Sequence, residues 1–212
     1  DAAFGTTYAC GISKPTAPDH EIGVRFLNIG TMYLQVFHDL DGTGGNAFYN
    51  VGSSLTTSNW HQITVTCEKG ASGSDKSTIK LYLDGTLVGT NINGPTKEKQ
   101  DAFSAESGQL FGVGARYGSN NSPALHSSAY FDEFAFWSTA LDADAVSAIY
   151  NSGASIDLSQ DSGDYDNSSN LESWYRFENN FDDSQANSSE GVAEGDPSFQ
   201  TNFGIGGSQT PP

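Results

Sequence analysis

Residues 130–153, YFDEFAFWSTALDADAVSAIYNSG, join an aromatic segment to a short amphipathic one. If residues 130–137 are extended, both faces of the segment carry aromatic side chains, which suits a pleated, half-buried strand. Asp142 is placed to cap the start of a helix, and Gly153 falls where a left-handed residue commonly ends one. The apolar face of that helix is formed by Val146, Ile149 and Tyr150. The stretch therefore predicts one strand followed directly by one short helix.

The rest of the chain is patterned for short strands separated by turns. Asp84 and Gly85 lie between two alternating apolar arms, which predicts a two-residue hairpin turn. Many short strands, one helix and no alternation of strands with helices favour an all-β antiparallel sandwich or jelly roll. We expect strands at 4–12, 21–27, 32–38, 47–51, 61–68, 78–83, 86–91, 109–114, 130–137 and 171–181.

Charge limits the possible partners of the chain. Its 212 residues include 26 Asp and Glu against 9 Lys and Arg, a formal net charge of −17. Nucleic acid is not an expected partner, because binding to phosphates needs clustered Lys and Arg. The acidity fits either a well-solvated surface or divalent-cation binding by some carboxylates. No apolar run approaches the roughly 20 residues that span a bilayer, so we expect no membrane insertion. The first residue is Asp1, so we expect a processed protein or a fragment.

Four motifs follow one another in an order typical of a known family. They are WHQITVTCEKG at 60–70, IKLYLDGTLVG at 79–89, QLFGVGAR at 109–116, and the stretch at 130–153. Together they resemble the laminin-G-like and pentraxin-like domains of the concanavalin A-like lectin/glucanase superfamily. The order of helix, connector and Trp-Tyr-Arg strand is also similar to laminin-G-like domains of marine bacteriophage structural proteins. The resemblance implies a concanavalin A-like jelly roll with one short helix.

The last part of the chain matches the same family out of order. Residues 174–199 resemble the segment that opens such domains, although here it closes the chain. Either it completes the sandwich in permuted fashion, or the chain was cut between tandem repeats. In the permuted interpretation, the strand at 130–137 needs the strand near Trp174 to complete its sheet. The expected layout is a main body at 1–157, an acidic connector poor in apolar residues at 158–170, a completing strand segment at 171–200 and a tail at 201–212.

A catalytic constellation is not found in the sequence. There is no Gly-x-Ser-x-Gly elbow, and neither cysteine has a histidine neighbour. Asp132 and Glu133 are the nearest approach to a glycosidase pair, but adjacent residues of a strand point to opposite faces. We therefore expect no enzyme. A glucanase-type or lyase-type enzyme is the third alternative, and it would need two carboxylates facing each other in a concave cleft.

Two kinds of binding site are predicted on loops. Calcium prefers 6 to 8 oxygen ligands, and the resemblance implies that it would bind at rim loops. Turns rich in Asp and Asn explain the same residues without a metal. The candidate calcium ligands are Asp182, Asp183 and Asn187, with Asp39 and Asp41 as a second set. The candidate glycan-binding residues are Tyr49, Tyr117, Asn120, Asn121 and His126, each of which also fits an ordinary polar loop.

Cys10 and Cys67 are the only cysteines, and a disulfide between them and two free thiols are equally compatible with the sequence. The leading functional hypothesis is a non-catalytic recognition module on a virion or other extracellular surface. Its partners would be a glycan or a host-surface protein, together with neighbouring subunits of a larger assembly. The alternative is a purely structural domain that decorates a phage particle.

Overall fold

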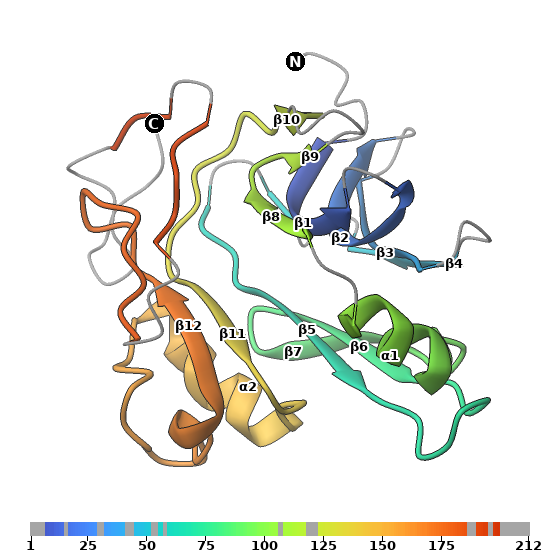
Figure 1. Cartoon of the computed structure of the whole chain (residues 1–212). Helices are drawn as coiled ribbons and strands as arrows, with labels where there is room; N and C mark the ends of the chain where they lie inside the picture. The colour runs from blue at the N-terminus through green and yellow to red at the C-terminus, as the bar shows by residue number, and fades with distance from the viewer. Residues whose placement is uncertain are drawn as a thin grey trace. The chain divides into compact units, whose positions relative to one another are not determined.

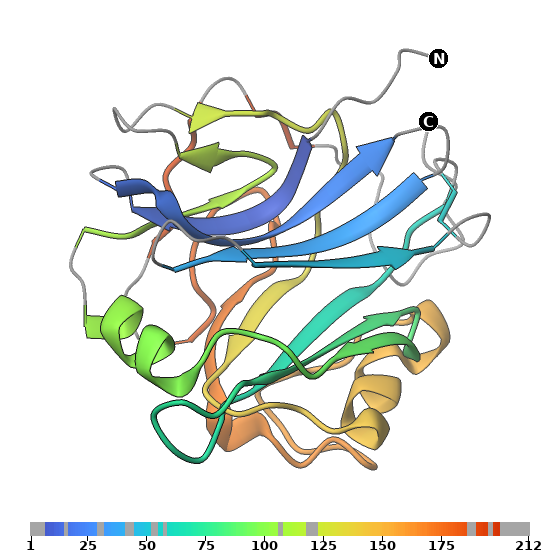
Figure 2. The same ribbon diagram turned by 90° about the vertical axis from the view of Figure 1, so that its right-hand side faces the viewer.

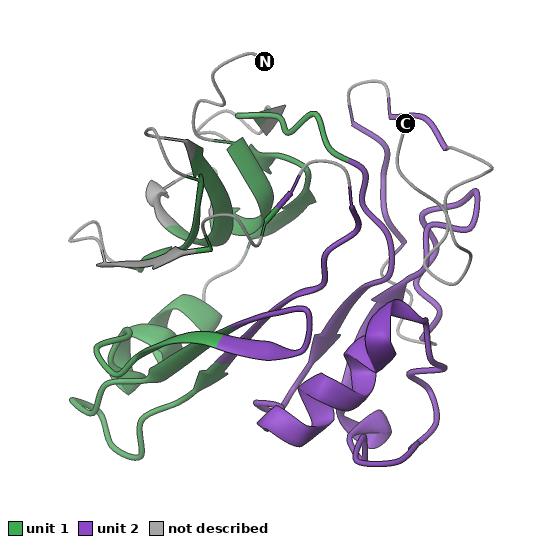
Figure 3. Ribbon diagram, turned by 180° about the vertical axis from the view of Figure 1, so that it is seen from behind, with its two compact units in different colours: residues 1–55, 67–81, 88–129 green, residues 56–66, 82–87, 130–212 purple. Residues whose placement is uncertain are grey.

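The computed structural model describes residues 7–14, 17–28, 32–40, 45–51, 55–56, 59–105, 108–117, 123–185, 190–194 and 197–199. Side chains of strand residues 14, 17–20, 28, 45–50 and 123 are not part of the description. The chain divides into two compact units, coloured separately in Figure 3. The first unit contains residues 1–55, 67–81 and 88–129, and the second contains 56–66, 82–87 and 130–212.

A five-stranded antiparallel sheet is the centre of the first unit (Figure 1). Its strands are β1 (Thr7–Lys14), β2 (Ala17–Asn28), β3 (Met32–Asp39), β4 (Gly45–Asn50) and β8 (Leu110–Val113), in the order β4-β3-β2-β1-β8. Residues paired across neighbouring strands share a face, so the register defines two faces of different character. One face is apolar and carries Ile12, Ile22, Val24, Leu34 and Val36. The other is mostly polar.

A short hairpin lies beside β1 and β8. It is formed by β9 (Arg116–Tyr117) and β10 (Pro123–Ala124), which pair antiparallel. Figure 2 shows both strands over the β1 and β8 end of the sheet. Backbone hydrogen bonds fasten the connections on either side, from Gly114 N to Ala9 O at 2.8 Å and from Tyr8 N to Leu125 O at 3.2 Å. The hairpin thereby brings Arg116 to the first strand.

A three-stranded sheet contributes residues to both units. It consists of β5 (Ile63–Glu68), β6 (Thr78–Leu83) and β7 (Thr86–Asn91), in that order. The predicted hairpin turn is confirmed, because Asp84 and Gly85 both have positive φ, at 51° and 72°. A Cβ on Gly85 would lie 3.0 Å from the Cβ of Tyr150, so the turn needs glycine for space as well as for conformation.

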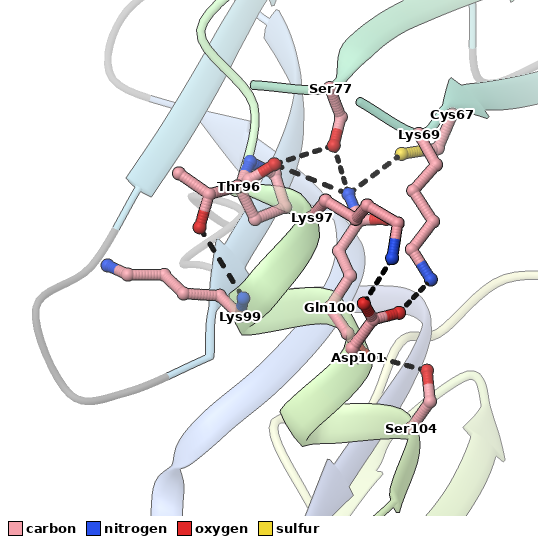
Figure 4. Close-up of polar contacts among 10 residues, drawn as sticks. Cys67, Lys69, Ser77, Thr96, Lys97, Lys99, Gln100, Asp101 and Ser104 are labelled. Carbon is pink, nitrogen blue, oxygen red and sulfur yellow. Dashed lines mark hydrogen bonds and ion pairs between the residues drawn. The ribbon is translucent and has the colours of Figure 1, made fainter. Parts of the chain in front are cut away.

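A helix that the sequence pattern did not predict packs on this sheet in the first unit. Helix α1 (Lys97–Ala105) buries only one side chain, Phe103. Its polar side chains hold it instead (Figure 4): the Gln100 amide donates to Ser77 Oγ and to Pro95 O at 3.4 Å, and lies 3.7 Å from Cys67 Sγ. A helix with so little apolar surface has no 3.6-residue hydrophobic period to detect.

The second unit contains a two-stranded sheet and helix α2 (Ala143–Tyr150). Strand β11 (Phe134–Trp137) pairs antiparallel with β12 (Leu171–Tyr175), so the expected pairing of the aromatic strand with the strand around Trp174 is confirmed. The core of the unit is formed by Tyr82, Leu141, Ala145, Val146, Leu158, Tyr165, Leu171 and Trp174. Together the antiparallel sheets confirm the expected all-β class, with two short helices in the described residues where one was expected.

The ends of α2 are only partly as predicted. Asp142 caps the N-terminus, since its Oδ1 accepts the Ala145 N–H at 2.8 Å. The C-terminus differs: the left-handed cap is Asn151 (φ 43°), two residues before Gly153. The short 3₁₀ turn η2 (Asn151–Gly153) follows this cap. Asn tolerates the left-handed region better than most residues, which lets the helix end early.

The acidic segment at 158–170 contributes to the core of the second unit. Leu158 and Tyr165 are both buried, and the Tyr165 hydroxyl donates to Leu158 O at 2.9 Å. The same hydroxyl accepts a hydrogen bond from Trp137 Nε1 at 3.0 Å. The 3₁₀ turn η3 (Ser168–Asn170) then leads into β12. Although the segment is poor in apolar residues, its few apolar side chains are placed inward. Among the described residues, no helix is long and apolar enough to cross a membrane.

Candidate functional site

The second face of the five-stranded sheet carries a cluster of polar and aromatic side chains. Cross-strand register places Tyr8 opposite Arg25 and Arg25 opposite Gln35, and it places Glu21 opposite Asp39. Because alternate residues of a strand share a face, Phe37 belongs to the same set. Arg116 reaches this set from β9. We call these residues the polar face: Tyr8, Glu21, Arg25, Gln35, Phe37, Asp39 and Arg116.

Glu21 is the buried centre of the polar face. It is only 4% exposed, and each of its carboxylate oxygens accepts a hydrogen bond. The Tyr8 hydroxyl donates to Oε1 at 2.9 Å, and Arg116 Nη1 donates to Oε2 at 2.6 Å. Burial, followed by the charge of Glu21, raises the pKa of Tyr8 to about 12, so the phenol stays a donor across the physiological range. The buried carboxylate therefore has both a neutral donor and a charged one.

Glycines make room for the Tyr8 ring on the sheet. A Cβ at Gly23 would lie 2.9 Å from Tyr8 Cε1 and 2.9 Å from Cys10 O, and a Cβ at Gly11 would lie 3.3 Å from Tyr8 Cδ1. The guanidinium of Arg25 lies 5.6 Å from the Tyr8 ring centroid and 3.9 Å from that of Phe37. Such cation–π contacts fix the position of the guanidinium over the aromatic rings.

Several buried polar atoms of the face have unused hydrogen-bonding capacity. Within the described part of the chain, Gln35 Oε1, Asp39 Oδ1 and Arg116 Nε have no hydrogen-bond partner. Gln35 is 2% exposed, whereas the Arg116 side chain is 26% exposed, so one edge of the face is open to solvent. A buried polar group without a partner costs about 1–3 kcal/mol. The face therefore combines a buried ion pair with unused hydrogen-bonding capacity.

A family model of the concanavalin A-like lectin/glucanases superfamily matches residues 10–147. The chain belongs to this superfamily. The matched region contains every residue of the polar face except Tyr8. The name of the superfamily includes both lectins and glucanases. Membership alone therefore does not decide whether a member binds carbohydrate or cleaves it.

One solved structure is similar to this chain at low sequence identity. It is a crystal structure of an S-layer domain-containing protein (residues 221–444) from Clostridium thermocellum, with 17% sequence identity and a TM-score of 0.31. The match covers 71% of this chain and 65% of that one. A search of the curated proteins found no match.

Two of the predicted glycan-binding residues lie beside the polar face. Tyr117 follows Arg116 in β9, and its carbonyl accepts a hydrogen bond from Ser13 Oγ at 3.0 Å. His126 is exposed, and the residue before it bonds through its carbonyl to the backbone of Tyr8. Asn120 and Asn121 lie outside the described residues, as does the side chain of Tyr49. Tyr117 and His126 are thus near the face, whose own residues were not among the predicted site residues.

The candidate calcium ligands do not gather in the described residues. Asp183 Oδ1 accepts backbone hydrogen bonds from Trp174 at 2.8 Å and Gln185 at 2.9 Å, as in a turn stabilised by Asp. Asp182 is exposed and Asp39 lies on the polar face. Asp41 and Asn187 lie outside the described residues. No three His, Cys, Asp or Glu side chains within the described ranges form a group that could hold a metal ion.

The acidic pair at 132–133 has a different geometry from the one expected. Strand β11 begins at Phe134, and Glu133 has a positive φ of 53°, so strand alternation does not apply to the pair. Glu133 Oε2 accepts a hydrogen bond from Trp174 Nε1 at 2.7 Å, and Arg176 Nε lies 3.8 Å from Oε1. Burial raises the pKa of Glu133. The carboxylate therefore holds the Trp174 side chain of β12 and pairs with Arg176, which follows the strand.

The Trp-His and Asp-Gly motifs of this superfamily member meet in the second unit. Thr56 N–H donates to His61 Nε2 at 3.1 Å, so the ring proton is on Nδ1 and is donated to Asp84 Oδ2 at 2.8 Å. Asp84 Oδ1 accepts the Gln62 N–H at 2.9 Å. Both ring nitrogens of His61 thus have partners: Nδ1 holds the β6–β7 turn through Asp84, and Nε2 accepts from the backbone of Thr56.

Both cysteines are free thiols, so the disulfide alternative is not formed in this structure. Burial raises the pKa of Cys10, in β1, to about 12. Cys67 is exposed, but desolvation by the surrounding chain also raises the pKa of its thiol. A thiol is nucleophilic as the thiolate, and a raised pKa keeps it protonated. Neither cysteine therefore has the environment of a catalytic nucleophile.

Proposed function

We propose that this chain is a non-catalytic carbohydrate-binding module that holds glycan against the polar face. The supporting observation is the set of buried hydrogen-bonding atoms without partners in the described residues, at Gln35, Asp39 and Arg116. Sugar hydroxyls both donate and accept hydrogen bonds, so they match a face that offers unused acceptors and an unused donor. Membership of a superfamily that includes lectins agrees with this proposal.

Binding fits the geometry of the carboxylates better than hydrolysis does. Glu21 and Asp39 are opposite each other on neighbouring strands and share a face, as the acidic pair of a glycosidase must. However, both oxygens of Glu21 already accept hydrogen bonds from Tyr8 and Arg116. With both oxygens engaged by these donors, Glu21 is poorly placed to contact a leaving group as a general acid. We therefore propose a face that holds its ligand intact.

An array of immobilised glycans probed with labelled wild-type protein tests this proposal. Arg25→Ala removes the guanidinium stacked on Phe37, and we expect it to abolish the signal of bound glycans. Lys69→Ala is the matched control, because Lys69 is an exposed cation of the same unit that pairs with Asp101. Thermal unfolding of both variants verifies that they are folded. Binding to no glycan, or equal binding by Arg25→Ala, contradicts the proposal, and release of reducing sugar contradicts its non-catalytic part.

We also propose an extracellular or virion-surface setting, where many copies would raise the avidity of a weak individual site. The sequence resemblance and the superfamily support this setting. A host-surface protein is the alternative ligand there. It would be recognised by loss of cell binding after protease treatment of the cells but not after glycosidase treatment.

Calcium is a separate proposal for the loop of Asp182 and Asp183. It is supported by the buried Asp183 Oδ2, which has no hydrogen-bond partner among the described residues. If the loop binds calcium, the ion raises the melting temperature and EDTA reverses the increase, because a ligand of the folded state stabilises it by mass action. An unchanged melting temperature at millimolar calcium would contradict calcium binding.

Assembly into a larger particle is a second candidate function, favoured by strand β7. This strand is at the edge of its sheet and carries no charged residue. Its large apolar side chains are exposed, at 47% for Leu87, 38% for Val88 and 68% for the following Ile92. Uncharged, apolar edge strands are prone to pair with another chain. Sedimentation velocity should then show oligomers that Val88→Lys disrupts, and a monomer at all concentrations would argue against self-assembly.

A further inference from the structure

We infer that strand β7 pairs antiparallel with β7 of a second copy of this chain, about a two-fold axis at Gly89, and joins two three-stranded sheets into one. The inference rests on the assembly function proposed above and names the partner, the register and the symmetry of the contact. It follows from the open backbone edge of β7, from the self-complementarity of that edge, and from the neutral charge of the surrounding segment.

The outer edge of β7 presents backbone groups that no strand pairs with in the described residues, where β6 is the only neighbour of β7. A two-residue turn makes its flanking residues, Leu83 and Thr86, a hydrogen-bonded pair, so every second residue of β7 from Thr86 onward bonds to β6. The N–H and C=O groups of the residues between them, Leu87, Gly89 and Asn91, therefore point to the open edge. Such an edge is a template for another strand.

The two edges of this sheet differ in their suitability for pairing. Leu87 and Val88 point to opposite faces of β7, and both are exposed, at 47% and 38%, so both faces have apolar surface to bury against a partner strand. Strand β5, at the other edge, carries the exposed and charged Glu68. A charge on an edge strand opposes pairing with another chain. Contact through β7 alone therefore closes as a dimer and does not continue into a filament.

An antiparallel contact between two copies of β7 is self-complementary. With the two-fold axis at Gly89, each Gly89 lies opposite its own copy, and each Leu87 lies opposite Asn91 of the other chain. This register pairs every outward-pointing backbone group of both strands. An axis at Val88 would instead place Asn91 opposite Gly85, which belongs to the turn. The register centred on Gly89 therefore forms the most hydrogen bonds.

Residues 63–105, which contain β7, are neutral although the chain is strongly acidic. Of the 9 Lys and Arg and the 26 Asp and Glu in the chain, five of each lie in this segment, so the formal net charge of −17 belongs to the remainder. One of these lysines lies just beyond β7, where Lys76 Nζ donates to Asn93 Oδ1 at 3.0 Å. Two copies of an acidic protein repel each other least where their charges balance. The segment therefore suits contact with a second copy of the same chain.

Sedimentation velocity over a concentration series tests the contact. One strand per copy is small beside the roughly 1,200–2,000 Å² of a stable interface, so we expect dimers at high micromolar concentration that dissociate on dilution. Added salt screens the repulsion between the acidic remainders and should increase the dimer fraction. Leu87→Pro removes an N–H that points to the second copy and keeps the bonds to β6, so it should weaken dimerisation at least tenfold. Leu87→Thr, the matched control, keeps that N–H and should weaken dimerisation less.

Disulfide cross-linking tests the register. With the axis at Gly89, Val88 lies opposite Thr90 of the second copy in a non-hydrogen-bonded pair, whose Cα atoms are about 4.5 Å apart. A disulfide spans this distance. Val88→Cys and Thr90→Cys proteins, both with Cys67→Ser to remove the exposed native thiol, should cross-link faster when mixed than either protein does alone.

The outcomes separate this inference from the assembly function on which it rests. A monomer at every concentration and salt would overturn both. Oligomers that grow beyond the dimer, equal weakening by Leu87→Pro and Leu87→Thr, or no faster cross-linking in the mixture would overturn the inference and leave self-assembly in place. If Leu87→Pro does not fold, which its thermal unfolding shows, the cross-linking of the two cysteine proteins decides the question.

Discussion

The Tyr8 hydroxyl donates a hydrogen bond of 2.9 Å to Glu21 Oε1, which joins β1 to β2 inside the polar face. Both residues are almost completely buried, at 1% and 4% exposure. Water therefore cannot easily replace the phenol as a donor. The bond contributes to the stability of the first unit as well as to the orientation of the carboxylate.

Tyr8→Phe should destabilise the protein by about 1–3 kcal/mol, because it leaves a buried carboxylate oxygen without its donor. Urea denaturation followed by tryptophan fluorescence measures the change. Tyr130→Phe is the matched control, since Tyr130 is 48% exposed, and it should change the free energy of unfolding by less than about 0.5 kcal/mol. Equal effects of the two variants would show that the Tyr8 hydroxyl is not needed.

Two ion pairs of the first unit, Arg116–Glu21 and Lys97–Asp101, should contribute very differently to stability. Arg116→Ala leaves Glu21 buried and unpaired, which costs about 3–5 kcal/mol in a fully buried pair and less here, because the Arg116 side chain is 26% exposed. Lys97→Ala removes one of the two lysines that pair with the exposed Asp101, and such exposed pairs contribute little to stability. Adding 0.5 M NaCl should reduce the second effect much more than the first. Similar losses for both variants would contradict the buried character of the Glu21 pair.

Gly23→Ala should cost about 1–3 kcal/mol, because the new Cβ would lie 2.9 Å from a backbone oxygen and from the Tyr8 ring. Gly73→Ala is a control with the same chemistry, since a Cβ at Gly73 meets nothing within 4 Å. The control should be neutral or stabilising by up to about 1 kcal/mol through the unfolded chain. Melting temperatures of the two variants that move in the same direction would count against the glycine platform under Tyr8.

Acid should destabilise the first unit through His38. Burial lowers the pKa of His38, while the charge of Asp39 opposes this change and the charge of Lys99 adds to it. The Nε2 atom of His38 has no hydrogen-bond partner in the described residues. The folded-state pKa thus lies below the unfolded value of about 6.5. Between these two pKa values the unfolded chain binds more protons than the folded one. The part of the free energy of unfolding that depends on neutral His38 is therefore complete above pH 6.5 and is lost as the pH falls.

Urea denaturation at pH 7.5, 6.5 and 5.5 measures this dependence. His38→Gln should flatten the decline in the free energy of unfolding below pH 6.5, whereas His126→Gln, at an exposed position, should preserve it. A decline that is the same in all three proteins would assign the acid sensitivity to other groups.

Local sequence patterns predicted most strands of this fold. The bounds of β6 and β7 are those expected, and Asp142 caps α2 as its position indicated. Helix α1 was missed because its attachment depends on the polar side chain of Gln100 rather than on an apolar stripe. The start of β11 was misplaced because Glu133 has a positive φ and a tertiary hydrogen bond to Trp174, and no local pattern encodes either.

The candidate site was harder to predict than the fold. In β2, Glu21 and Arg25 alternate with Ile22 and Val24, and that period of two indicates one polar face. However, the partner of Glu21 is Arg116, 95 residues further along the chain. Single-sequence reasoning finds which residues share a strand face but not which distant side chain completes their hydrogen bonds.

The same separation bears on the order in which the chain assembles. Strands β1 to β4 follow one another as adjacent antiparallel neighbours, so contacts between nearby residues can build them early. Strand β8 and Arg116 can join only after a long loop closes, which is entropically costly. On a ribosome, a nascent chain that ends before Arg116 would carry Glu21 without its cationic partner. The polar face is therefore completed only after Arg116 has been synthesised.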